Sequence, residues 1–138
     1  MPTSVLGVSL QLPIWTVLFQ YPNFAVTYES GFDEVPRFDA SLEVFGKHRT
    51  VKVVYDTPYV KGLPVTMVVR EAVKGDPGAF QERTVRKTYE DPYTLELKEL
   101  WEMVVNGKEV KTTPADAKND LEVFGMIMKA AEKQREGA

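Results

Sequence analysis

The sequence contains no cysteine and a single histidine, His48. Without cysteine there can be no disulfide framework, no thiolate nucleophile and no cysteine zinc site. One histidine cannot build a multi-histidine metal site, so we expect no bound metal. A serine-histidine-aspartate triad would depend on His48, which lies between Lys47 and Arg49 in an expected turn. There it is either a solvated loop residue or a catalytic base.

Long hydrophobic runs and an excess of positive charge are also missing. The apolar start of the chain is interrupted by Pro2 and Pro13, and it lacks a basic n-region and a small-residue cleavage site. It therefore resembles neither a membrane span nor a signal peptide. The formal net charge of −3 argues against binding nucleic acid by phosphate neutralisation. We expect a soluble, cytoplasmic protein with neither nucleic acid nor membrane among its partners.

The first two thirds of the chain show the residue alternation that is typical of β-strands. One hairpin is expected across the Pro22-Asn23 turn, and a second across the turn at residues 46–49. Two further strands follow, and a weaker extended segment precedes the first hairpin. The expected strands are residues 5–12, 14–21, 24–30, 40–45, 50–56, 65–72 and 79–89.

Two helices are expected in the last third. Asp91 is a good N-cap before Pro92, and Asn106-Gly107 is a typical helix end. Thr113-Pro114 opens a second helix, with Asp116 in the capping-box position. Each helix carries an apolar stripe. The stripes are Tyr93, Leu97, Leu100, Trp101 and Val104 in the first, and Ala117, Leu121, Phe124, Met128 and Ala131, widened by Val123, Ile127 and Ala130, in the second.

These elements predict an α+β fold in one domain, residues 1–138. We expect an open antiparallel sheet of five to six strands, with the two C-terminal helices packed on one face. Strands 14–21 and 50–56 carry large apolar side chains on both faces. A second apolar face on a small domain usually marks a partner surface. We therefore expect a homodimer that forms through the sheet face.

Several stretches, taken in order, resemble the C-terminal domain of the Gfo/Idh/MocA oxidoreductases, with fungal members the most similar. The run NFAVTYESGFDEVPRFDASLEVFGKHRTVKVVYDTPYVKGLPVTMVV matches its pattern of a strand with an aromatic end, a short turn, a strand ending near Ser-Gly, and a hairpin. The ending also fits. The matching residues are the turn Phe45-Gly46-Lys47-His48, then Tyr93, Leu97, Gly107, Thr113-Pro114 and Asp120-Leu121, within a span from Val8 to Lys133.

This resemblance implies the same fold, an open antiparallel sheet with helices on one face and dimerisation through the other. The family's redox chemistry lies in a nucleotide-binding domain with a Gly-x-Gly-x-x-Gly turn, which this sequence does not contain. The family's Glu-Lys-Pro motif and its Asp-x-x-x-His helix are absent as well. No catalytic residue is therefore carried over, and we expect no cofactor and no nicotinamide dehydrogenase activity from this chain alone.

Aromatic residues at the strand ends are the candidates for a small-molecule site. With hydroxyl donors and a nearby cation they could line an apolar cleft, although core or interface packing is the ordinary role of such residues. The segment 29–39 also holds four acids that could act at the sheet rim, with Arg37 orienting a carbonyl or carboxylate. Lys61 could act as an electrostatic clamp. The candidate substrate-binding residues are Trp15, Phe19, Tyr21, Tyr28, Arg37, Tyr55 and Tyr59.

Two functions follow. The first is a free-standing, cofactor-independent enzyme that shapes an apolar substrate for cyclisation, isomerisation or a pericyclic reaction of the Diels-Alder type, in natural-product biosynthesis. The natural-looking ends of the chain favour it. The second is a non-catalytic dimerisation or substrate-binding fragment of a full-length oxidoreductase. An enzyme predicts a closed apolar cleft lined by Tyr and Arg, whereas a module predicts that its largest exposed apolar patch lies where the nucleotide domain is missing. We expect a homodimer in both cases.

Overall fold

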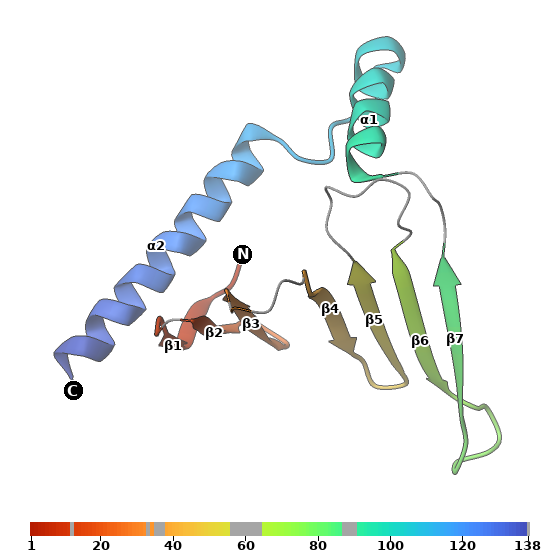
Figure 1. Cartoon of the computed structure of the whole chain (residues 1–138), viewed down its shortest axis with the longest axis horizontal. Helices are drawn as coiled ribbons and strands as arrows, with labels where there is room; N and C mark the ends of the chain where they lie inside the picture. The colour runs from red at the N-terminus through yellow and green to blue at the C-terminus, as the bar shows by residue number, and fades with distance from the viewer. Residues whose placement is uncertain (12, 33, 35–37, 56–64, 87–90, 138) are drawn as a thin grey trace. The chain divides into compact units, whose positions relative to one another are not determined.

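The computed structural model describes residues 1–11, 13–32, 34, 38–55, 65–86 and 91–137 (Figure 1). These residues form two compact units, Met1–Pro36 with Lys111–Ala138 and Arg37–Val110. Each unit combines antiparallel strands with one helix, so the α+β class is confirmed. The elements are β1 (Ser4–Ser9), β2 (Ile14–Gln20), β3 (Ala25–Gly31), β4 (Ala40–Phe45), β5 (Arg49–Tyr55), β6 (Thr66–Ala72), β7 (Phe80–Arg86), α1 (Pro92–Asn106) and α2 (Pro114–Glu136).

The first unit is a three-stranded sheet of order β1-β2-β3 on which α2 packs. The pairing of β2 with β3 runs without interruption from Ile14↔Gly31 to Gln20↔Ala25. The pairing of β1 with β2 contains an irregularity between Val5 and Gly7. Because side chains alternate across a strand, this register places every second residue of β2 on the face toward α2.

The core of this unit lies between that face and α2. Val17 is the most completely buried side chain, and Val8, Phe19 and Ala131 complete the buried cluster. Ile127 and its neighbours on the same side of α2 pack against it. Three other large apolar side chains of α2 stay more than half exposed, Leu121, Phe124 and Met128. The core therefore uses Ala131 of the predicted stripe together with the residues that widen it, Val123, Ile127 and Ala130.

The second unit is a four-stranded sheet in which β4, β5, β6 and β7 pair in chain order. Its register separates two faces of different character. One face, here called the apolar face, carries Ala40, Leu42, Val44, Val51, Val53, Tyr55, Met67, Val69 and Val85, with Arg49, Glu71, Gln81 and Arg83 at its margins. The other, the polar face, alternates charged and hydroxyl side chains with a few apolar ones. Of the described hydrophobic residues in this unit, Val69 alone is buried.

The helix ends agree with the sequence signals. Asp91 caps α1 by accepting hydrogen bonds from the backbone N–H and the hydroxyl of Thr94, at 3.0 and 2.9 Å. Gly107 ends α1 in the left-handed conformation, with φ of 65°, which favours glycine because it has no Cβ. Thr113 and Asp116 form the capping box of α2. These predictions are confirmed.

The predicted single sheet is wrong. The described strands form two sheets of three and four strands, and β3 and β4 are not hydrogen-bonded neighbours. The two helices do not share a sheet face either, since α2 packs on the three-stranded sheet and α1 buries no residue. Local alternation predicts strands and hairpins, but it says nothing about how one hairpin pairs with the next. The single domain 1–138 stays a prediction.

Candidate functional site

Two of the candidate aromatic residues lie together on the three-stranded sheet. Tyr28 pairs with Val17, and Trp15 lies two residues before Val17 on the same strand, so both aromatic side chains are on the core face. Diagonal neighbours of this kind lie within reach of each other when one is aromatic. Trp15 is 47% exposed and Tyr28 is 49% exposed. They form an accessible aromatic pair beside a buried core.

Two other candidates are committed to packing in the same unit. Phe19 is a member of the buried core cluster, so its ring is not accessible to a ligand. Tyr21 stacks on Phe24 with ring centroids 4.5 Å apart and an interplanar angle of 9°. The backbone N–H of Tyr21 also donates to the Phe24 carbonyl at 2.8 Å. Tyr21 therefore secures the turn between β2 and β3.

The remaining candidates fall in the other unit or outside the described residues. Tyr55 ends β5, lies on the apolar face and is 42% exposed. Arg37, Tyr59 and Lys61 lie outside the described residues. The structure therefore brings Trp15 and Tyr28 together and does not test a site that would join them to Arg37 or Tyr59.

His48 lies in an exposed turn, as expected. The Gly46 N–H donates to the Arg49 carbonyl at 2.8 Å and closes the turn, and the His48 carbonyl accepts from the Ala72 N–H at 3.3 Å. An open hollow of about 400 Å³ lies beside the turn. Arg49 pairs there with Glu71, whose second oxygen accepts a hydrogen bond from Gln81. The side chains at this turn are a basic surface rather than an enclosed pocket.

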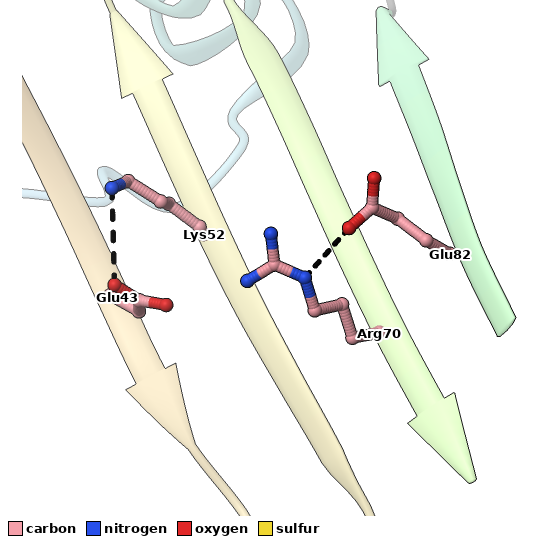
Figure 2. A network of polar contacts seen from close by, with 4 residues as sticks. All are labelled: Glu43, Lys52, Arg70 and Glu82. Carbon is pink, nitrogen blue, oxygen red and sulfur yellow. Dashed lines mark hydrogen bonds and ion pairs between the residues drawn. The ribbon is translucent and has the colours of Figure 1, made fainter. Parts of the chain in front are cut away.

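The polar face carries cross-strand ion pairs (Figure 2). Lys52 Nζ lies 3.9 Å from a carboxylate oxygen of Glu43, and Arg70 Nε lies 2.7 Å from one of Glu82. All four side chains are at least 30% exposed, so each pair contributes little to stability. Phe45 and Phe80 lie on the same face and are 78% and 69% exposed. The expectation that β5 is apolar on both faces is therefore only partly met.

One carboxyl has a shifted pKa. The backbone N–H of Thr113 donates to Asp116 at 2.8 Å, and the Thr113 hydroxyl donates to the same oxygen at 2.8 Å. These hydrogen bonds favour the ionised form and lower the pKa of Asp116 from its ordinary value of 3.8. This carboxyl serves the cap of α2.

Within the part of the chain that the structure describes, no group of three or more His, Cys, Asp or Glu residues could hold a metal.

An apolar sheet face was expected as a partner surface, but not on a separate four-stranded sheet. Its side chains were visible as alternating residues, but the polar character of the opposite face depends on the register between strands. Leu42 and Val44 are 58% and 55% exposed on this face. Neither described helix is both long and apolar enough to cross a membrane.

No protein family, curated protein or solved structure matches the chain in comparisons with all three.

Proposed function

We propose that this chain is a non-catalytic dimerisation and substrate-binding module of a Gfo/Idh/MocA-type oxidoreductase. The observation that carries the proposal is the apolar face of the four-stranded sheet, on which Leu42, Val44 and Tyr55 are 42% to 58% exposed while the opposite face carries ion pairs. A sheet with one apolar face needs a second layer to exclude water from it. The dimer forms through this face.

Two hollows lie beside the 46–49 turn, and both are open. They are lined mainly by the turn and its polar neighbours. A pocket for an apolar substrate would instead be enclosed and lined by apolar and aromatic side chains.

A matched pair of variants tests this function. Val53→Lys places a charge in the apolar face, and Val54→Lys places the same charge on the polar face of the same strand. We expect the first variant to have the mass of a monomer in light scattering, with the far-UV circular dichroism of the wild type. The second should stay dimeric. Equal masses for the two variants, whether dimeric or monomeric, would contradict the proposal.

A second function is favoured by the aromatic pair. Trp15 and Tyr28 offer an accessible surface on which a flat, apolar small molecule can stack. In a cofactor-independent cyclase or isomerase this pair would hold the substrate in a reactive shape. Trp101→Phe leaves Trp15 as the sole tryptophan, so quenching of its fluorescence by aromatic ligands tests the idea. Quenching that Tyr28→Ala leaves unchanged would count against a binding surface.

A further inference from the structure

Helix α1 has an apolar stripe that stays exposed among the described residues of its unit. Five side chains on one side of the helix form the stripe, and no residue of α1 is buried. Each of the five is about half exposed or more. They are Tyr93, Leu97, Leu100, Trp101 and Val104. The same unit therefore contains two uncovered apolar surfaces, this stripe and the apolar face of the sheet.

The two surfaces match in length. The 15 residues of α1 span about 22 Å at 1.5 Å per residue. The strands of the sheet have six or seven residues, which span about 20 to 24 Å. One helix of this length therefore spans the sheet along the direction of its strands.

The position of α1 in the sequence favours docking on a second copy. Only residues 87–91 separate β7 from α1, so a helix docked on its own sheet starts beside β7. A helix is about 10 Å across and covers about two strands spaced 4.8 Å apart. On the apolar face the most exposed side chains, Leu42, Val44 and Tyr55, lie on β4 and β5, which are three and two strands away from β7. A helix from another chain does not have this constraint.

We propose that two copies of this chain exchange α1, so that the stripe of each copy covers the apolar face of the other. This inference rests on the proposed dimer and names the element that completes it. The five side chains of the stripe and the three exposed side chains of the apolar face each leave roughly 100 Å² accessible. One helix-on-sheet contact therefore covers roughly 800 Å². Two symmetric contacts cover roughly 1,600 Å², the size of a standard stable interface. The exchange is reciprocal, as a two-fold dimer requires.

Cysteine trapping tests the exchange, and the absence of native cysteine makes it clean. Val53→Cys places a thiol on the apolar face, and Leu97→Cys places one on the stripe. The two single variants are unfolded, refolded as a mixture and treated with a short bis-maleimide. We expect a two-chain product that contains one copy of each variant. The same treatment of Val54→Cys with Leu97→Cys should lose this product, because Val54 lies on the polar face.

Each other outcome has a definite meaning. A product that links only two Val53→Cys chains indicates sheet-to-sheet packing, which overturns the exchange and leaves the proposed dimer standing. A product within one chain of the Val53→Cys, Leu97→Cys double variant, without a two-chain product, also overturns the exchange. A wild-type chain that is a monomer in light scattering overturns both proposals.

Discussion

Truncation of Val17 to alanine should destabilise the first unit. Val17 is 2% exposed between Val8 and Tyr28 on the neighbouring strands, and it belongs to the cluster that contains Ala131 of α2. Val17→Ala removes two methyl groups, worth about 0.8 kcal/mol each in transfer free energy, and leaves a cavity in a small core. We therefore expect a loss of about 2 to 3 kcal/mol.

The two tryptophans allow the units to be observed separately. Trp15 belongs to the first unit and Trp101 to the second. In a Trp101→Phe background, Val17→Ala should lower the urea midpoint of Trp15 fluorescence by about 1 to 2 M for a typical slope. Val54→Ala, at a side chain that is 37% exposed, should leave it unchanged. A midpoint shift for Val17→Ala no larger than that of the control would refute the assignment of the core.

Two further predictions concern local geometry. Because its lowered pKa lies below 3.8, ionised Asp116 stabilises the start of α2 above about pH 4, and this contribution is lost as pH falls through the lowered pKa. Asp116→Asn should therefore flatten the acid-induced loss of helical circular dichroism. Thr113→Ala should cost about 1 kcal/mol in a urea titration; an unchanged midpoint would contradict the capping role. Gly31→Ala should lower the melting temperature markedly, because its Cβ would lie 2.3 Å from the Pro13 carbonyl oxygen, whereas Gly7→Ala meets nothing within 4 Å. Equal melting temperatures would contradict the close approach at Gly31.

The sequence predicted the local elements well because their signals are local. The N-caps of both helices depend on residues within three positions of each other. The β2–β3 hairpin follows from alternation on both sides of a two-residue turn. The division into two sheets was not predictable, because it depends on hydrogen bonds between segments that the chain separates by the stretch 32–39. Which part of α2 is buried was not predictable either, since the stripe and the residues that widen it are all apolar.

The candidate site shows the same limit. Aromatic residues at strand ends were recognised, but whether each is accessible depends on what packs above it. Phe19 lies under α2, whereas Trp15 on the same face stays half exposed. The apolar face could be recognised only from the register of the four strands, which places Glu43 and Lys52 on the opposite side. Such long-range pairing has no signal in a single sequence.

The mass of the wild-type chain in solution tests the central claim most directly. Light scattering at micromolar concentration should give a dimer with twice the chain mass of 15.6 kDa, because the apolar face requires a second copy to cover it. A mass of 15.6 kDa across the micromolar range would show that the face stays uncovered and would contradict the proposed association.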